Sequence, residues 1–167
     1  MAPAFDEFVA ARGEALLRFG LMLCGDRHLA EDLVQSVLAK AYPRWSRIVA
    51  MQRPEAYLKT VLVNEHLRWW RRRSSREVPA AAPVRQREPV GPDDAGRHAS
   101  RDAAWELLRS LPKRQRAVLV LRYYEDLPDA EIAAILGCAE STVRSQATRA
   151  LAALRAAVPA MDREALP

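Results

Sequence analysis

Apolar residues recur every three or four positions along most of this chain, which is the period of an amphipathic helix. The first such stretch predicts a helix from about Phe5 to Cys24, in which Gly13 and Gly20 are weak helix formers. Gly25 and Asp26 come next, and we expect them to end this helix and to begin another.

Two more helices are predicted before residue 77. The inner stripe of the first of these comprises Leu29, Leu33, Val37 and Ala41. Pro43 should end or kink it, because proline has no backbone N–H and crowds the preceding turn. Pro54 and Glu55 suit the first turn of the other helix, where a missing N–H is harmless and a carboxylate meets the positive helix end. Its apolar positions are Tyr57, Leu58, Val61, Leu62 and Leu67.

The periodicity stops between Glu77 and Ala99, where prolines, glycines and scattered charges predict a flexible linker. The sequence is 50% hydrophobic but only 7% aromatic and is rich in Ala, Leu and Arg, which favours helices. The fold class predicted is all-α, with two small helical domains, 1–76 and 100–158, joined by the linker 77–99. Residues 159–167 are expected to form a short, frayed tail.

Periodic positions resume in the second domain. Ser100 is a candidate N-cap for a helix through Trp105 and Leu111, and Pro112 opens another helix. The run 117–121 is the best strand candidate in the chain, but its flanks favour a helix.

The stretch from Asp129 to Leu154 has the pattern of a helix-turn-helix. Ile132, Ile135 and Leu136 fall on one face of a short helix, and Gly137 supplies the turn. The inner stripe of the following helix comprises Val143, Ala147, Ala150, Leu151 and Leu154.

The second helix of this motif turns hydroxyls and guanidiniums outward, groups that suit phosphate oxygens and base edges. They belong to Ser141, Thr142, Arg144, Ser145, Thr148 and Arg149. The alternative is an amphipathic helical hairpin with a solvated polar face, because such patterns also arise by chance in alanine-rich helices.

The formal charge of +5 and the isoelectric point near 9.7 are moderate, but the positive charge is concentrated. Arginines at positions 68, 71, 72, 73 and 76 surround Trp69 and Trp70. Indoles stack on unpaired bases for about 1–3 kcal/mol each while guanidiniums hold the backbone, which favours strand-separated DNA. The alternative is that one tryptophan fills the core and the arginines are a solvated helix end. The two indoles are not expected to lie in the core together, since neighbouring side chains on a helix point about 100° apart.

Other classes of site have little support. Cys24 and Cys138 lie far apart with no Cys or His at ligand spacing, so a buried free thiol is favoured for each over a metal site or disulfide. The N-terminus lacks a basic segment followed by an apolar run, and no apolar stretch reaches the ~20 residues that span a bilayer. No nucleotide loop, nucleophile with a base, or metal-spaced carboxylates indicate an enzyme, and no cofactor is predicted. We expect a cytoplasmic protein without membrane insertion.

The whole chain resembles sigma-70 family RNA polymerase sigma factors of the extracytoplasmic-function type, and within that type the actinobacterial SigE-family group. The resemblance lies in ordered segments over nearly all of the chain outside the linker and tail. They are the segments 28–35 (HLAEDLVQ), 54–58 (PEAYL), 61–64 (VLVN), 69–73 (WWRRR), 111–119 (LPKRQRAVL), 122–127 (RYYEDL) and 142–151 (TVRSQATRAL).

This resemblance implies that 1–76 is region 2, which binds core RNA polymerase and the −10 element, and that 100–158 is region 4, which binds the −35 element. Asp32 and Gln35, with Glu31 beside them, match residues that dock on the clamp coiled coil of core polymerase. From the pattern alone they would be a solvated face. Asn64 matches the family's asparagine, at a loop or helix end, that takes up a flipped base. An amide can donate to and accept from a base edge, although without the family Asn64 would be a helix cap.

The remaining implied contacts are with DNA. Lys59, Arg68, Arg71, Arg72 and Arg73 would follow the non-template strand, with Trp69 or Trp70 available to stack. Arg144 and Gln146 would be the best base or phosphate contacts at −35. Arg149, Lys113 and Arg114 would hold phosphates, which positions a helix without reading sequence.

Two positions depart from the family pattern. Pro128 and Ala139 stand where Ser or Thr caps often precede the two helices of the motif. Losing a cap costs about 1 kcal/mol, so Ser141 or Glu140 substitutes or the helix starts less firmly. These departures affect the −35 sequence preference and not the fold.

The resemblance implies that the protein delivers RNA polymerase to promoters. Its expected partners are core RNA polymerase and promoter DNA, and an anti-sigma factor is a third partner that is common in the family. The alternative is a stand-alone helix-turn-helix transcription regulator whose N-terminal domain serves as an effector or dimerisation module. A helical adaptor that binds only protein would leave the arginine block unexplained.

Overall fold

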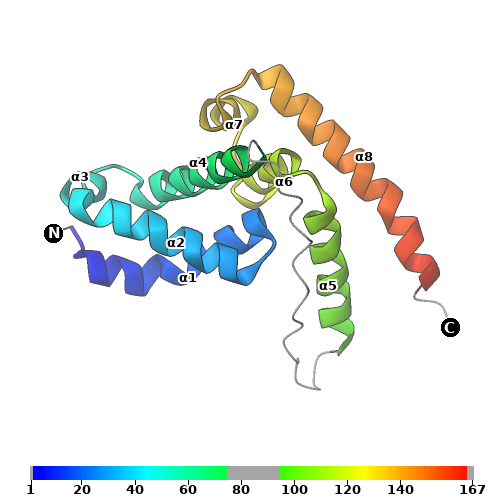
Figure 1. Cartoon of the computed structure of the whole chain (residues 1–167), viewed down its shortest axis with the longest axis horizontal. Helices are drawn as coiled ribbons and strands as arrows, with labels where there is room; N and C mark the ends of the chain where they lie inside the picture. The colour runs from blue at the N-terminus through cyan, green and yellow to red at the C-terminus, as the bar shows by residue number, and fades with distance from the viewer. Residues whose placement is uncertain (1, 75–94, 165–167) are drawn as a thin grey trace.

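The computed structural model describes residues 2–74 and 95–164, and no strand occurs within them (Figure 1). The predicted all-α class is confirmed. The N-terminal elements are α1 (Phe5–Cys24), α2 (Arg27–Ala41), a 3₁₀ turn η1 (Tyr42–Arg44), α3 (Trp45–Val49) and α4 (Pro54–Ser74). The C-terminal elements are α5 (Ala95–Ser110), α6 (Lys113–Leu119), a π-helical turn η2 (Val120–Tyr124), α7 (Asp129–Leu136) and α8 (Glu140–Glu164).

The ends of α1, α2 and α4 follow the sequence signals. Gly25 ends α1 in the left-handed conformation with φ +68°, and the Asp26 carboxylate then accepts a hydrogen bond from the Leu29 amide at 2.9 Å. The helix α2 ends at Ala41, before Pro43, and α4 begins at Pro54, so these predictions are confirmed.

The three long N-terminal helices pack around large apolar side chains. Gly20 is buried where α1 packs on α2, and an added Cβ there would lie 3.3 Å from Val34 Cγ2, a tight contact to which the Val34 side chain would have to adjust. The large core side chains of these helices and of α3 are Phe8, Leu16, Phe19, Leu23, Val34, Val37, Trp45, Ile48, Leu58, Leu62 and Val63.

The C-terminal core is made of smaller side chains. Gly137, at φ +63°, ends α7 and turns the chain into α8, which confirms the helix-turn-helix geometry. The segment 117–121 lies within α6 and η2 and is helical, as its flanks indicated. The core residues here are Leu111, Ala117, Val118, Leu119, Val120, Leu121, Ile132, Ala133, Leu136, Val143, Ala147 and Ala150.

Several boundaries differ from the prediction. The helix expected to begin at Ser100 begins at Ala95, because the residues before Ser100 include good helix formers. The rest of the predicted linker, residues 77–94, lies outside the described residues. The expected frayed tail after Val158 is wrong as far as Glu164, since α8 continues to that residue. Tyr57 was assigned to the apolar face of its helix but is 40% exposed, and Val63 and His66 are buried instead.

The two groups of helices contact each other mainly through α1 and α4 on one side and α6 and α7 on the other. Helices α6 and α7 lie against α4, and α6 also lies against the end of α1 (Figure 1). The apolar side chains of both groups form one continuous cluster. The end of α4, where the tryptophans and arginines are, therefore lies beside the C-terminal helices.

Candidate nucleic-acid interface

The last turns of α4 carry an exposed aromatic and basic surface. Arg68, Arg71, Arg72 and Arg73 are exposed, and Trp69 is 39% exposed. The guanidinium carbon of Arg73 lies 5.1 Å from the centre of the Trp69 ring, a cation–π distance. The exposed indole and guanidiniums are accessible for the contacts with a base and with phosphates that the sequence predicts.

Trp70 is the less accessible of the two tryptophans. Its ring meets that of Trp69 edge to face at 4.6 Å between centroids, and Lys113 Nζ lies 3.2 Å from its ring centre. Its indole Nε1 is buried without a hydrogen-bond partner within the described residues. Trp69 is therefore the indole available to a base in this conformation.

A buried polar group lies beneath these rings. His66 is 4% exposed, and its Nδ1 lies 3.6 Å from the Cys24 Sγ. Burial and the positive charges of Arg116 and Lys113 lower the pKa of His66 to about 4, so it is neutral at pH 7. Burial likewise raises the pKa of the Cys24 thiol to about 12, which keeps it protonated. Neither group is poised for nucleophilic chemistry.

Lys59 is not free to follow a DNA strand in this conformation. Its Nζ lies 2.9 Å from an oxygen of Glu125 and 3.0 Å from one of Glu55, and its side chain is 16% exposed. Burial alone would lower the Lys59 pKa, but hydrogen bonds to the two carboxylates outweigh it and raise that pKa. Local sequence gave no sign of this ion pair, because Glu125 is 66 residues from Lys59.

The other predicted region 2 residues lie on exposed helix surfaces. Asn64 is exposed but lies in the interior of α4, so its expected place at a loop or helix end is wrong; the helix that begins at Pro54 runs unbroken to Ser74. Asp32 and Gln35 are exposed on α2, and Glu31 beside them accepts a hydrogen bond from Arg27 at 2.9 Å.

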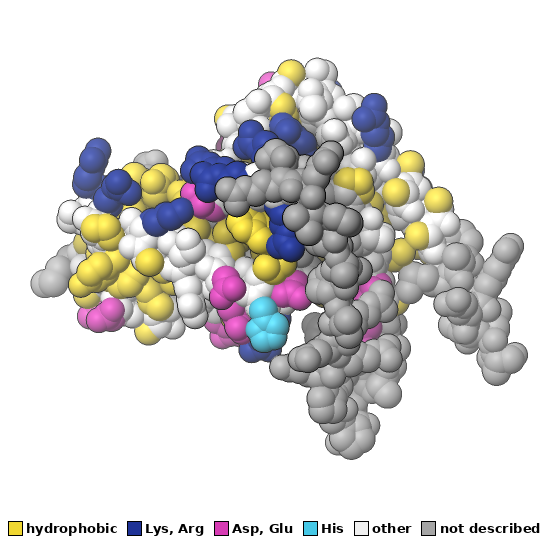
Figure 2. All heavy atoms as spheres, in the orientation of Figure 1, with side chains coloured by type: hydrophobic (Ala, Val, Ile, Leu, Met, Phe, Trp, Pro, Cys, Tyr) yellow, Lys and Arg dark blue, Asp and Glu magenta, His cyan; other side chains and the backbone are white. Residues whose placement is uncertain are grey.

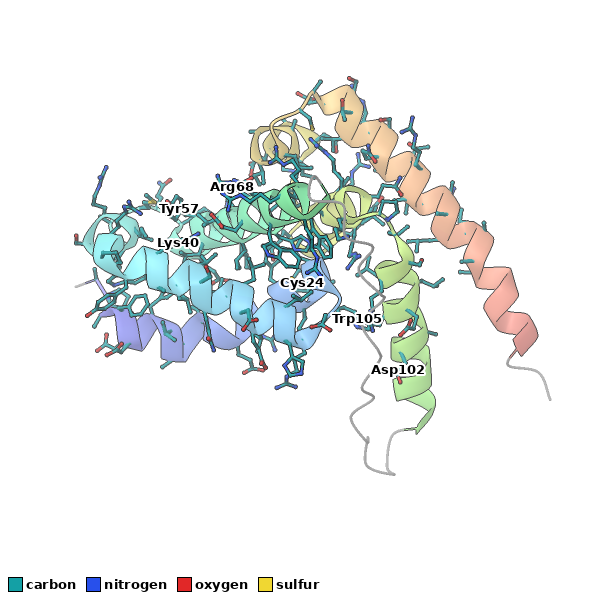
Figure 3. All side chains as sticks on the ribbon, viewed as in Figure 1. Cys24, Lys40, Tyr57, Arg68, Asp102 and Trp105 are labelled. Atoms are coloured by element: carbon teal, nitrogen blue, oxygen red, sulfur yellow. The ribbon has the colours of Figure 1, made fainter. Side chains whose placement is uncertain are left out.

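Tyr57 extends the exposed edge of α4. Tyr57, Asn64 and Arg68 are separated by seven and four residues, which places them on one side of the helix. Figure 3 shows Tyr57 and Arg68 along the same edge. The hydrophobic pattern predicts Tyr57 in the apolar core, but its spacing to Asn64 is the signal that places it on this exposed edge.

The recognition helix α8 presents the predicted polar face. Ser141, Arg144, Ser145, Thr148 and Arg149 are exposed. Thr142 and Gln146 are half-buried, so they reach a ligand less easily. The opposite face, with Val143 and Ala147, packs on α7 and α6. Arg144 lies 3.5 Å from Glu140, an exposed pair that DNA phosphates can replace at little cost.

Arginines hold both ends of α7. Arg122 pairs with Asp129 in the first turn at 2.7 Å, and Arg114 donates to the Leu136 carbonyl at the last turn at 3.2 Å. The Arg114 contact satisfies a carbonyl at the C-terminal end of α7, whereas Pro128 provides no side-chain cap at its N-terminal end. Arg114 was predicted as a phosphate anchor, and in this structure it also fixes the turn of the helix-turn-helix.

Positive charge gathers on one face of the molecule. Figure 2 shows Lys and Arg side chains over α3, α4 and the start of α8, whereas Asp and Glu gather where α2 begins. No group of His, Cys, Asp or Glu within the described residues is placed to hold a metal ion. None of the described helices is both long and apolar enough to cross a membrane.

An exposed indole among arginines on one helix, with a helix-turn-helix on the same chain, defines a DNA-binding helical protein. The family model "Sigma-70 region 2" matches residues 8–76, and "Sigma-70, region 4" matches residues 101–154. The chain belongs to the sigma-70 family and is a sigma factor of the extracytoplasmic-function type, that is, a transcription initiation factor and not an enzyme.

Named relatives agree over almost the full chain. The RNA polymerase sigma-E factor of Streptomyces coelicolor is 40% identical over 163 residues, covering 96% of this chain and 89% of that protein. The extracytoplasmic-function sigma factor SigL of Mycobacterium tuberculosis is 35% identical over 159 residues, covering 93% and 86%. The chain is also similar to the sigma factor RpoE of Bartonella quintana, solved with the anti-sigma factor NepR, at 26% identity and a TM-score of 0.67 over 93% of this chain and 96% of that one.

Proposed function

We propose that this sigma factor divides promoter recognition between the two surfaces described above. The α4 surface, with Asn64, Arg68, Trp69 and Arg71–Arg73, captures the separated non-template strand at the −10 element. The exposed face of α8 reads the −35 element in the major groove. The observation that carries the proposal is the pairing, on one chain, of an exposed indole among guanidiniums with an exposed recognition face.

The contacts at −35 differ in what they contribute. Arg144 is exposed near the start of α8, where a helix in the major groove contacts base edges. Arg149 lies farther along and suits a phosphate, which positions the helix without selecting sequence. Gln146 is half-buried and contributes less than the sequence pattern suggested.

Docking on core RNA polymerase is assigned to α2. Asp32 and Gln35 lie one turn apart and both are exposed, so they can meet a partner helix together. Since polymerase and chromosomal DNA are in the cytoplasm, we infer that the protein acts there.

Run-off transcription tests this assignment. Purified core RNA polymerase from Streptomyces coelicolor, the source of a 40% identical relative, is incubated with genomic fragments with and without this protein. We expect discrete transcripts that require the protein and that the double variant Asp32→Ala, Gln35→Ala weakens by about tenfold or more. The variant Ser36→Ala, at an exposed position of the same helix, is the matched control and should transcribe normally.

Two results would contradict the proposal. The first is an unchanged transcript level in the double variant. The second is salt-sensitive, sequence-specific duplex binding by the protein alone with no polymerase-dependent transcript, which would move the function to a stand-alone regulator.

An anti-sigma factor is the remaining partner proposed. It would inhibit this chain by covering either the α2 face with Asp32 and Gln35 or the recognition face of α8. Such a protein should compete with core polymerase in the run-off reaction, and slowed amide exchange on α2 or α8 would identify the covered face.

A further inference from the structure

The short helix α3 and the turn before it present arginines on the side away from the core. Trp45 and Ile48 are buried, and the Trp45 indole donates from Nε1 to the Pro3 carbonyl at 3.1 Å. Arg44 and Arg47 are three residues apart, so they share a face, and both are exposed. The buried side chains therefore hold α3 in a position from which two guanidiniums reach solvent.

These arginines differ from other exposed cations of the region 2 helices in having no carboxylate partner. Neither Arg44 and Arg47 nor Arg53, in the loop after α3, forms an ion pair within the described residues. Exposed cations on α1 and α2 do form such pairs, which are Arg12–Glu55 at 3.5 Å, Arg18–Glu14 at 3.3 Å, Arg27–Glu31 at 2.9 Å and Lys40–Glu65 at 2.9 Å. Positive charges that no carboxylate offsets favour an anionic partner.

The unpaired arginines adjoin the α4 surface. Helix α3 lies against α4, and Figure 2 shows Lys and Arg side chains over both helices on one face. The Arg53 carbonyl accepts a hydrogen bond from the Tyr57 amide at 3.1 Å, so Arg53 lies at the first turn of α4. Tyr57 begins the exposed edge that continues through Asn64 and Arg68. The arginines therefore extend this edge beyond the start of α4.

The full length of α4 separates the two basic ends of this surface. Arg71–Arg73 lie in the last turns of this 21-residue helix, and Arg53 precedes its first residue. A helix of that length spans about 30 Å. A stacked strand advances about 3.4 Å per nucleotide, so a strand that reaches both ends would cover about nine nucleotides.

We propose that the separated non-template strand runs past the start of α4 and that Arg44, Arg47 and Arg53 hold its phosphates there. Guanidiniums contact phosphates whatever the sequence, so these contacts strengthen strand capture without selecting bases. Met51 and Tyr57, which are 41% and 40% exposed, provide apolar surface between the arginines against which bases can lie. This inference rests on the single-strand role proposed above for the α4 surface.

Oligonucleotides of different length test the extended strand path. The probes are fluorescent single-stranded DNAs with the −10 sequence found by run-off transcription, either alone or extended by six nucleotides at the 5′ or the 3′ end. Fluorescence anisotropy gives their affinity for the complex of this protein with core polymerase. We expect extension at one end to tighten binding by about fivefold or more. Arg44→Gln, Arg47→Gln should reduce this gain to about twofold or less and bind the unextended probe normally.

The salt dependence of binding counts the phosphate contacts. Each contact with a single strand contributes about 0.7 to the slope of log Kobs against log salt concentration, so the double variant should lower the slope by about 1.4 on the extended probe. Arg44→Lys, Arg47→Lys keeps both charges and should keep the slope. The matched control is Arg18→Gln, Arg155→Gln, which removes two charges at exposed positions of α1 and α8 and should leave the slope unchanged.

The possible outcomes distinguish this inference from the proposed function. An affinity gain and a slope that both survive in Arg44→Gln, Arg47→Gln overturn the extended path and leave the −10 assignment standing. Weaker binding of core polymerase by this variant, with an unchanged slope, would assign the arginines to a protein contact and also overturn the inference. Failure of the unmodified complex to bind even the unextended probe overturns the single-strand role of α4 together with the extended path.

Discussion

The two domains of this sigma factor are held together by different means. The region 2 helices bury large side chains such as Phe19, Leu16 and Leu62. The region 4 helices bury mainly Leu, Ala and Val, and no aromatic ring is buried among their described residues. Arginines bonded to backbone carbonyls or to a carboxylate hold their ends. Since hydrophobic stabilisation scales with buried apolar area, region 2 should be the more stable unit and region 4 should depend on polar contacts, some of which reach into region 2.

Matched core truncations test this difference most strongly. Leu62→Ala should lower the free energy of unfolding by about 4 kcal/mol, because it leaves a cavity in the fully packed region 2 core, whereas Leu136→Ala should cost about 2 kcal/mol at the less enclosed end of α7. Urea denaturation measures both. Equal losses, or a larger loss at Leu136, would contradict the comparison.

The free energy of unfolding should fall in acid because of the buried His66. The pKa of His66 is lowered to about 4 in the folded chain, so between pH 6.5 and pH 4 the unfolded chain binds a proton that the folded chain does not. Stability should therefore fall as the pH drops through this window, by about 3 kcal/mol at most.

The variant His66→Gln isolates that effect. The fall in its unfolding free energy between pH 7 and pH 4 should be smaller than in the unmodified chain. In His28→Gln, which changes an exposed histidine, the fall should be unchanged. Urea titrations at the two pH values give the comparison. The same acid sensitivity in both variants would show that His66 does not carry it.

Two glycines with the same backbone conformation allow the packing around the end of α1 to be compared with that around the end of α7. Gly25 and Gly137 have φ of +68° and +63°, but only Gly25 has atoms close to the site of an added Cβ. Gly137→Ala should cost about 1 kcal/mol of conformational strain, and Gly25→Ala about 2 kcal/mol because Arg116 must also move. Thermal unfolding midpoints compare them, and equal shifts would argue against close packing around the end of α1.

Local signals in the sequence were sufficient for most of the fold. Gly25, Pro54 and Gly137 each specify a helix end through their backbone conformation, and Asp26 does so through its side-chain carboxylate. The structure has helix ends at all four. The exposed recognition face of α8 and the exposed arginines of α4 also follow from helical periodicity.

The side-chain contacts that the sequence did not predict are with residues far away along the chain. The sequence indicated no role for Arg116, because its acceptor on α1 is 93 residues away. Lys59 and Trp70 were assigned to DNA with no indication that Glu125 and Lys113 would meet them. Periodicity gives the face of a helix and not its partner, although the spacing of Leu58, Leu62 and His66 could have placed the histidine in the core.

Transcription from two forms of one promoter most directly tests the assignment of the −10 strand to α4 and of the −35 element to α8. One template is fully paired, and the other is mismatched across the −10 region so that its strands are already separated. We predict that Trp69→Ala fails on the paired template and recovers on the premelted one, because the indole acts in strand capture. Arg144→Ala should be defective on both, since −35 recognition needs intact duplex in either template, whereas the exposed Arg155→Ala on the same helix should be active on both. Equal activity of Trp69→Ala on the two templates, or recovery of Arg144→Ala by premelting, would contradict the assignment of the two surfaces.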